Sequence, residues 1–238
     1  DGEKEIIVID GGSTDGTRQL AARRPGVRLL SARRGRGRQI QAGAEAARGS
    51  VLLVLHADGR LPQDALRRID AACASGAKWG WFDLRYDSPR AALRVIGWLL
   101  NLRSRILADP TGENAVFATR AAWDAAGGCP DEPLMEDFLL SQRLRRLGRG
   151  TRLWGPVVCS ARRYELWGVT RMCLRSALLL AAFRLGMAPR ILARHYPHVR
   201  TASPSDAGVA LRRQQPATAD GDRAAPPRWE GHPLTEPK

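Results

Sequence analysis

Residues 5–17 read EIIVIDGGSTDGT, an apolar run that ends on a carboxylate and passes directly into glycines and small hydroxyl residues. Ile6–Ile9 predict a buried strand, and Gly11–Ser13 predict the loop at its carboxyl end. The RQLAARR segment after Thr17 has a helical pattern, so the unit is strand, loop and helix. In open α/β sheets, ligands bind beyond the carboxyl ends of the strands. Asp10 lies at that edge, and the loop is therefore expected to face a nucleotide-like ligand.

A second apolar run, Val51–Leu55, predicts another buried strand and is followed by His56-Ala57-Asp58, so two strands end close to an acid. Further strands are expected at 27–30, 79–86, 115–119 and 152–158, and helices at 39–48, 61–74, 89–107, 120–126 and 134–147. Strands that alternate with helices of this length predict an α/β fold with a mostly parallel sheet flanked by helices.

The C-terminal part of the chain divides into a helical and an irregular segment. From Leu166 to about Arg194 the pattern is helical, with arginines interrupting an apolar surface. Such amphipathic helices pack on a sheet, on a partner or on a membrane surface. Residues 198–238 are rich in Pro, Ala, Gly and charge, which predicts a disordered tail. The expected folded domain is therefore residues 1–197.

The composition places the excess charge in that domain. The 238 residues carry 38 Lys+Arg against 24 Asp+Glu, a net charge of +14, while residues 201–238 hold five bases and five acids. A basic folded domain suggests phosphate-bearing partners such as a nucleotide, a nucleic acid or an anionic lipid. The four cysteines have no paired or metal-ligand spacing, which predicts reduced thiols in a cytoplasmic protein. No apolar run reaches the ~18 residues of a membrane span.

Five motifs occur in a characteristic order: DGGSTDGT at 10–17, GRGRQIQAGAEAARG at 35–49, LHAD at 55–58, LMEDFLLSQRLRRLG at 134–148 and SARRYE at 160–165. Together they resemble family-2 glycosyltransferases of the GT-A fold, and within them the small bacterial branch often encoded beside radical-SAM proteins. The resemblance covers roughly residues 5–195. It implies a GT-A type, Rossmann-like α/β domain with C-terminal amphipathic helices. It also implies an N-terminal truncation, with the family's first strand missing before Asp1.

For the nucleotide, the resemblance assigns recognition of the nucleobase to Asp10, whose carboxylate would accept a hydrogen bond from N3–H of uracil. Ser13 is a residue type that suits a loop or a helix N-cap. Ser13 and Gln39 are both expected among the nucleotide-binding residues. His56 would contact ribose or phosphate.

A guanidinium group can donate hydrogen bonds to two phosphate oxygens at once. The resemblance therefore assigns binding of the pyrophosphate to Arg36, Arg162 and Arg163. The structural alternatives are that Asp10 caps its own turn, that His56 is a packing residue and that the arginines are only solvated.

The triplet His56-Ala57-Asp58 resembles a D-x-D motif with His in place of the first acid. A departing diphosphate must be neutralised, and a hard divalent cation held by carboxylates and phosphate oxygens does this. The resemblance therefore implies Mg²⁺ or Mn²⁺ on Asp58.

The pair Glu136-Asp137 matches the E-D pair at the start of a helix in the family. Asp137 would be the catalytic base that deprotonates the acceptor hydroxyl, a role worth ~10²–10⁴ in rate. Glu136 would position the acceptor or the loop. Two acids in a first turn also suit the helix dipole without any catalysis.

The implied function is inverting transfer of a sugar from a nucleotide-sugar donor, UDP-linked, to an unknown acceptor hydroxyl on a lipid or a saccharide. One alternative is a sugar-phosphate nucleotidyltransferase, which would carry a glycine-rich basic signature at its first strand. The other is a basic module that binds nucleic acid or membrane, which would cluster Lys/Arg with aromatic residues. The arginines here are scattered, which disfavours nucleic acid. The expected location is the cytoplasm, with peripheral contact at the inner face of the plasma membrane.

Overall fold

The stretch that opens the chain forms two parallel strands connected through a helix. β1 (Ile6–Asp10) and β2 (Val27–Ser31) hydrogen-bond in parallel along their whole lengths, and α1 (Thr17–Ala22) lies between them in sequence. The structure is a computed structural model and describes residues 4–196. The predicted order of strand, loop and helix is confirmed.

The other strands form a five-stranded sheet in the order β3-β6-β5-β7-β4. Their bounds are β3 (Val51–Leu53), β4 (Gly59–Arg60), β5 (Trp79–Tyr86), β6 (Phe117–Thr119) and β7 (Thr151–Cys159). β5 and β7 run parallel, whereas β6 pairs antiparallel with β3 and β5, and β4 pairs antiparallel with β7. The two-residue β4 was not predicted from the sequence.

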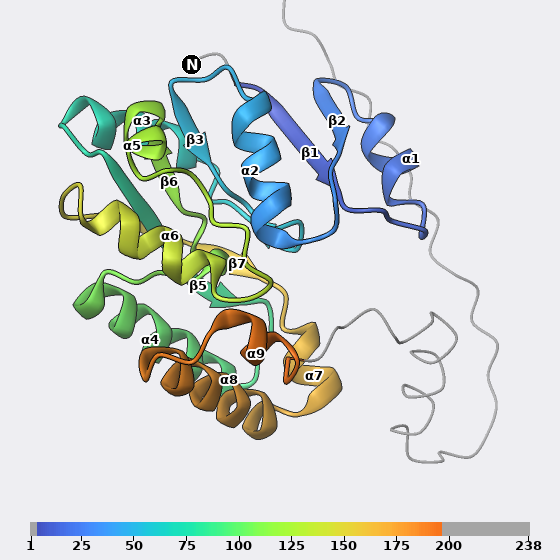
Figure 1. Ribbon diagram of the computed structural model, residues 1–238, viewed down its shortest axis with the longest axis vertical. Coiled ribbons are helices and arrows are strands. Elements are labelled where there is room, and N and C mark those ends of the chain that lie inside the picture. The colour runs from blue at the N-terminus through green and yellow to red at the C-terminus, as the bar shows by residue number, and fades with distance from the viewer. Residues whose placement is uncertain (1–3, 197–238) are drawn as a thin grey trace, which may run out of the picture. The chain divides into compact units, whose positions relative to one another are not determined.

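The pairing is therefore mixed, which corrects the expectation of a mostly parallel sheet. Glu113, shortly before β6, accepts a hydrogen bond from the Tyr86 hydroxyl at the carboxyl end of β5 (2.9 Å). β6 thus enters the sheet from the end where β5 leaves it, and it must run antiparallel to β5. The predicted α/β character holds, with helices flanking the sheet (Figure 1).

The helices between the strands begin and end within a few residues of their predicted bounds. They are α2 (Arg36–Ala46), α3 (Ala65–Ala74), α4 (Ala91–Leu107), α5 (Arg120–Ala125) and α6 (Glu136–Arg145). α2 packs against β1, and α4 packs against β5. Because α6 begins at Glu136, the E-D pair occupies its first turn, as predicted.

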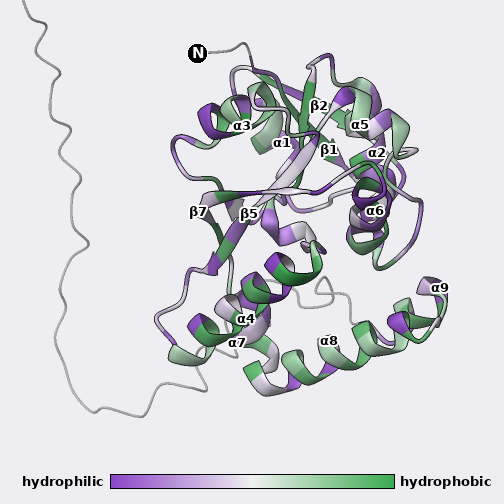
Figure 2. Cartoon of the chain, turned by 90° about the vertical axis from the view of Figure 1, so that its left-hand side faces the viewer, coloured by the Kyte–Doolittle hydropathy of each residue, from purple (hydrophilic) through white to green (hydrophobic). Residues whose placement is uncertain are grey.

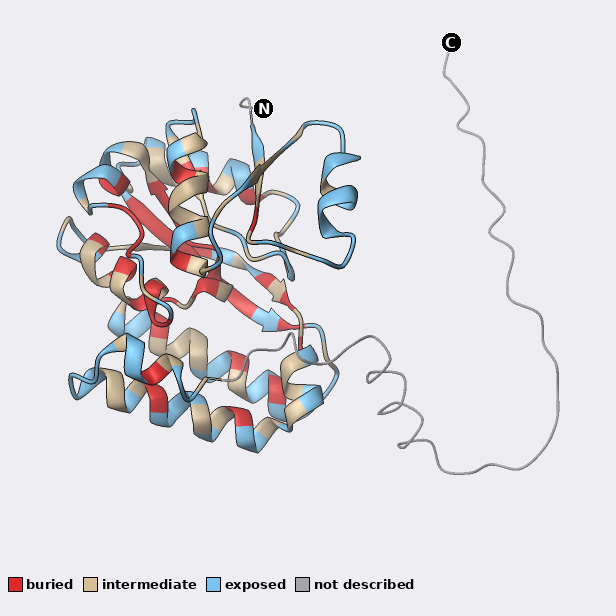
Figure 3. Ribbon diagram, turned by 45° about the vertical axis from the view of Figure 1, so that its right-hand side comes forward, coloured by how far each residue is buried: buried red, intermediate tan, exposed pale blue. Residues whose placement is uncertain are grey.

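The core lies along the central strands, whose buried residues Figure 3 shows in red. One apolar cluster includes Phe82 and Leu93, and a second includes Trp79 and Trp81. Trp79 and Trp81 are buried, whereas Trp98 is 59% exposed. Trp98 follows the buried Leu93 by five positions, which puts it on the other side of α4.

The C-terminal helical pattern consists of three helices, as the expected C-terminal amphipathic helices imply. They are α7 (Arg162–Trp167), α8 (Val169–Arg184) and α9 (Pro189–Ala193). Gly168, with a φ of 82°, separates the first two, and Gly186, with a φ of 94°, follows the second. These backbone angles suit glycine and stop a helix.

Figure 2 shows hydrophobic residues along α4 and α8. Within residues 4–196, none of the helices combines the length and apolar character needed to cross a membrane. The tail predicted to be disordered lies outside the described residues and remains a prediction.

Candidate active site

Asp10 ends β1, and only 3% of the residue is exposed. Its oxygens accept hydrogen bonds from the backbone N–H groups of Gly12 (3.1 Å) and Ser13 (3.1 Å) and from the Arg18 guanidinium (3.0 Å). The hydrogen bond from the Ser13 side chain, together with those from Arg18 and the backbone, outweighs burial and holds the pKa of Asp10 well below its ordinary value. Asp10 is therefore a charged carboxylate that caps its own loop. A nucleobase N–H would share it with these donors.

Gln39 joins the same loop to α2. Its Nε2 donates to the carbonyl oxygen of Ile9 (2.9 Å). A Cβ on Gly11 would lie 2.8 Å from the Gln39 side-chain oxygen, so only glycine allows this approach. The structure gives Gln39 a supporting position under the loop.

Arg36 and Glu136 form an ion pair between α2 and α6. Arg36 Nε lies 2.6 Å from Glu136 Oε1, and Glu136 is 1% exposed. Burial and the neighbouring Asp137 raise the pKa of Glu136, and the charge of Arg36 opposes that shift. The pair fixes the start of α6, in line with the positioning role expected for Glu136. Arg36, expected at the pyrophosphate, already has a carboxylate partner.

Asp137 is half-buried, and backbone donors fix its carboxylate. Oδ2 accepts from the N–H of Gly112 (2.8 Å), and Oδ1 accepts from the N–H of Phe138 (2.8 Å). Met135, two residues earlier, has a φ of 65°, a left-handed conformation that costs a non-glycine residue about 1–3 kcal/mol. Each oxygen keeps a free lone pair, so Asp137 can accept the proton of a hydroxyl group.

His56 lies against the same glycine. A Cβ on Gly112 would lie 2.5 Å from His56 Nε2 and 3.6 Å from Asp137 Oδ2, so the imidazole and the carboxylate both lie next to the position that a side chain at Gly112 would occupy. His56 Nε2 is buried and has no hydrogen-bond partner among the described residues. Burial and the charge of Arg36 lower the pKa of His56 against the opposing effect of Asp137. The lowered pKa makes the imidazole neutral at pH 7, and its Nε2 is a buried nitrogen without a hydrogen-bond partner within residues 4–196.

Asp58 follows His56 in a tight turn, which the hydrogen bond from Gly59 N–H to the His56 carbonyl oxygen closes (2.9 Å). Its side chain is exposed, and its charge acts on both His56 and Glu113. Within residues 4–196, no group of three or more His, Cys, Asp or Glu side chains is placed to hold a metal ion. A cation on Asp58 would therefore have to take most of its other ligands from a substrate, such as the oxygens of a diphosphate.

Glu113 is a further acid at this site that the sequence did not assign. Its Oε2 accepts from the Tyr86 hydroxyl (2.9 Å), whose oxygen lies 3.1 Å from that of Tyr164. Burial raises the pKa of Glu113, and the hydrogen bond from Tyr86 and the charge of Arg163 oppose this effect. The charges of Asp58 and Asp137 both act on Glu113, so the three acids belong to one region.

The two arginines of the SARRYE motif differ in their surroundings. Arg163 donates to the Tyr196 hydroxyl (2.9 Å), and its charge acts on His56 and Glu113, so it belongs to the site. Arg162 is exposed. The structure therefore brings together Arg36, His56, Asp58, Glu136, Asp137 and Arg163. Asp10, Ser13 and Gln39 lie at the separate β1 loop.

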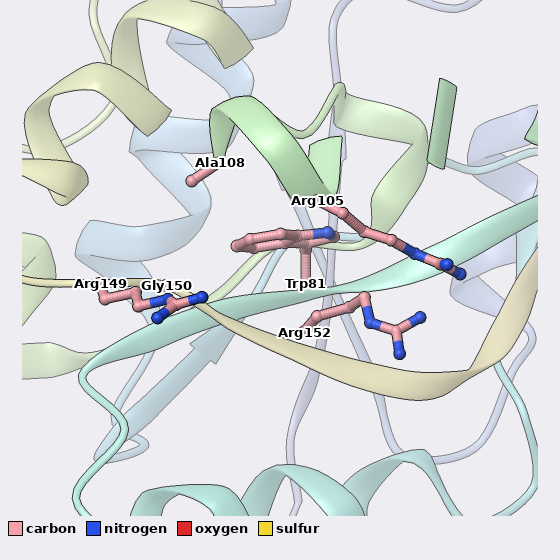
Figure 4. A pocket seen from close by; sticks show the side chains of 6 residues that line it. All are labelled: Trp81, Arg105, Ala108, Arg149, Gly150 and Arg152. Atoms are coloured by element: carbon pink, nitrogen blue, oxygen red, sulfur yellow. The ribbon is translucent and has the colours of Figure 1, made fainter. Parts of the chain in front are cut away.

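A cavity of about 330 Å³ lies elsewhere, next to Trp81 (Figure 4). Arg105 and Arg152 both approach Asp83 Oδ2 at 2.7 Å, so this buried carboxylate joins α4 to β5 and β7. These ion pairs account for two of the three arginines that line the cavity, and the third is Arg149. We attribute the cavity to the packing around this ion-pair cluster and assign it no ligand.

Comparisons with known proteins bear on the family and the fold of the chain. A family model described as glycosyl transferase family 2 matches residues 1–122, just over half of the 238-residue chain. No curated protein matches the sequence significantly.

Among solved structures, S. aureus TarS (residues 1–349) is 15% identical with a TM-score of 0.51, over 77% of this chain and 56% of that one. Another S. aureus TarS structure is 16% identical with a TM-score of 0.53, over 71% of this chain and 33% of that one. The mannosyltransferase PcManGT from Pyrobaculum calidifontis, in complex with GDP-Man and Mn²⁺, is 20% identical with a TM-score of 0.51, over 87% and 69%. The chain thus matches about half or less of the length of the TarS structures. These likenesses show a shared fold.

Proposed function

Because the chain belongs to glycosyl transferase family 2 and has its GT-A type α/β fold, we propose that it is an inverting glycosyltransferase. It moves a sugar from a UDP-linked donor to an acceptor hydroxyl. The observation that carries the proposal is the juxtaposition at Gly112, where a backbone N–H holds Asp137 beside a His56 nitrogen that has no described partner. The mannosyltransferase of similar fold, in complex with GDP-Man and Mn²⁺, supports a nucleotide-sugar donor and a divalent cation.

Asp137 acts as the base. The acceptor oxygen attacks the anomeric carbon on the face opposite the diphosphate, and its proton passes to a carboxylate oxygen of Asp137. The electron pair of the breaking C1–O bond leaves with the diphosphate. Glu136 does not compete for the proton, because it is buried against Arg36.

The diphosphate is bound next to His56. Asp58 would hold Mg²⁺ or Mn²⁺ together with phosphate oxygens, and the bound cation supplies positive charge to the departing diphosphate. Arg163 adds a fixed positive charge whose effect reaches His56 and Glu113. His56 Nε2 hydrogen-bonds a ribose or phosphate oxygen, and Arg162 approaches the diphosphate from the exposed side of α7.

The acceptor is a lipid or a saccharide, and the enzyme works in the cytoplasm at the inner face of the plasma membrane. The distribution of charge supports an enzyme rather than a nucleic-acid-binding module, because acids lie at the site and the nearby arginines pair with them. We also propose that the chain belongs to the small bacterial branch of this family that is often encoded beside radical-SAM proteins.

Substitutions of the two central acids test the mechanism. Asp137→Asn keeps the size of the side chain and removes the base, so it should bind UDP normally and lose about 10²–10⁴-fold in transfer. Asp58→Ala removes the cation ligand and should weaken both UDP binding and transfer. Binding is measured as the thermal shift with UDP, GDP and CDP with and without Mn²⁺, and transfer as UDP release from UDP-sugars with water as acceptor.

Asp70→Asn, in an exposed acid on α3, is the matched control and should match the unsubstituted protein in both assays. Undiminished UDP release by Asp137→Asn would overturn the assignment of the base. A thermal shift with UDP that is the same with and without Mn²⁺ would overturn the role given to Asp58.

A further inference from the structure

α4 is apolar on both of its sides. Leu93, Gly97 and Ser104 are buried against the rest of the protein. The opposite side carries Val95, Trp98, Leu99, Leu102 and Ile106, which follow the helical repeat. Trp98 is 59% exposed and Ile106 is 70% exposed. A soluble helix normally turns polar residues outward, so this stripe is an apolar face without a partner among the described residues.

α8 repeats the arrangement. Its buried residues, Met172 and Leu179, face the protein. Its outer side carries Leu174, Leu178 and Ala181, and Leu185 follows at its C-cap on the same side, with Leu178 61% exposed and Leu185 88% exposed.

The two helices lie next to each other. Arg103 of α4 and Arg184 of α8 both pair with the buried Asp109, at 3.3 Å and 2.5 Å. Figures 1 and 2 place both helices at the same end of the molecule, away from β1 and β2. The outer stripes of α4 and α8 thus belong to one region, which we call the α4–α8 face.

The charged side chains on the helices of this region are all basic, although four of the arginines pair with acids from neighbouring segments. α4, α8 and α9 contain seven arginines and no Asp or Glu. Arg94, Arg171 and Arg175 form no ion pair with an acid among residues 4–196. An apolar stripe bordered by arginines, with a tryptophan among its exposed residues, has the composition of a helix that lies in a membrane interface.

We propose that the α4–α8 face docks on an anionic lipid bilayer. Charge selects this occupant, because a second copy of the chain would bring two acid-free basic surfaces together, whereas anionic headgroups attract each arginine by about 1 kcal/mol. The helices lie in the interface and do not span it, in line with their length and composition.

Docking would place the catalytic acids close to the headgroups. The inner side of α8, at Leu179, packs in one apolar cluster with Leu134, Met135 and Phe138, which surround the Glu136-Asp137 pair. A helix is about 10–12 Å across, so roughly one helix separates this pair from the bilayer surface. Vesicle binding is measured without sugar transfer, so this inference, which shares the membrane location of the proposed function, and the proposed sugar-transfer chemistry fail independently.

Vesicle flotation tests the proposal with the full chain. Vesicles of phosphatidylcholine and phosphatidylglycerol in equal parts should carry the protein upward, and vesicles of phosphatidylcholine alone should not. Leu174→Ser/Leu178→Ser should weaken binding about tenfold or more, because it removes exposed apolar surface that the interface would bury. Arg171→Gln/Arg175→Gln should also weaken binding about tenfold or more and should reduce its sensitivity to salt.

The matched control is Leu20→Ser on α1, where a leucine is 65% exposed at a site distant from the face. It should bind like the unsubstituted protein. Absence of binding by folded protein, equal binding to neutral vesicles, or equal loss in Leu20→Ser would overturn the proposal. Concentration-dependent dimerisation that Leu174→Ser/Leu178→Ser abolishes, without vesicle binding, would assign the face to a second copy instead.

Discussion

The ion pair between Arg36 and Glu136 allows a prediction with a specific pH dependence. Arg36→Met removes the guanidinium and leaves a carboxylate that is 1% exposed without its partner. Removing one partner of a fully buried pair costs about 3–5 kcal/mol. Because the Arg36 side chain is 37% exposed and partly screened by water, we reduce the expected loss in free energy of unfolding to about 2 kcal/mol at pH 7.5.

The loss should shrink as the pH falls. Burial raises the pKa of Glu136 above its ordinary value of 4.5, so the folded protein holds this proton to a higher pH than the unfolded chain does. The stability that the protonated acid contributes is complete below about pH 4.5 and is lost as the pH rises through the folded pKa. Without Arg36 that pKa rises further, and the variant should approach the unsubstituted protein at the acidic end.

Urea unfolding at several pH values measures both effects, with the slope m as the check on two-state behaviour. The double variant Arg36→Met/Glu136→Gln should recover more than about 1 kcal/mol, because no charge stays buried. Arg38→Met is the control on the same helix. Its pair with Asp131 has side chains 41% and 62% exposed, so its loss should stay within about 0.5 kcal/mol. An Arg36→Met loss no larger than the control's, or one independent of pH, would refute the reasoning.

Two further predictions concern the surroundings of Asp137. Gly112→Ala would set a Cβ 2.5 Å from the His56 ring, so the imidazole or the loop must move, and UDP release should fall about 10²-fold. Gly97→Ala, whose nearest contact is 3.8 Å, is the control and should leave UDP release unchanged. Tyr86→Phe removes the hydroxyl that donates to Glu113 and should cost about 1–2 kcal/mol in urea unfolding. Because burial raises the pKa of Glu113, this loss should be larger at pH 8 than at pH 4.5, where the protonated acid is less sensitive to the missing donor; a loss that grows toward low pH would contradict the assignment.

The sequence predicted the parts of the site that follow apolar runs or begin a helix. Asp10 and Asp58 could be placed because an apolar run precedes each of them, and Asp137 because a helical repeat follows it. The run before Asp10 is less buried than predicted, since Ile6 is 48% exposed. Residue types and periodicity are local signals, and they suffice where a side chain's place depends on its own element. The antiparallel entry of β6 depends on a chain reversal that these signals do not describe.

Glu113 and its tyrosines could not be found in this way. Tyr86 reads as the last residue of an ordinary strand, and Tyr164 lies 78 positions further along the chain. The hydrogen bond that makes Glu113 part of the site exists only because β5, η1 (Gly112–Asn114) and α7 meet. Such contacts between distant segments follow from topology, and no periodic pattern encodes them.

The loop at residues 109–114, which includes η1, connects the acids of the site to the α4–α8 face. Ala108 and Ala115 bracket this loop with φ angles of 49° and 46°, conformations that persist only where neighbours hold them. Asn114 supplies one restraint, accepting from Thr111 N–H (2.9 Å) and donating to the Phe82 carbonyl oxygen (2.9 Å). Asp109 supplies the other through its arginine partners on α4 and α8. The N–H of Gly112 that holds Asp137 is therefore fixed from one side by the sheet and from the other by these two helices. A change in how α4 and α8 are held would act on the geometry of the base through this loop.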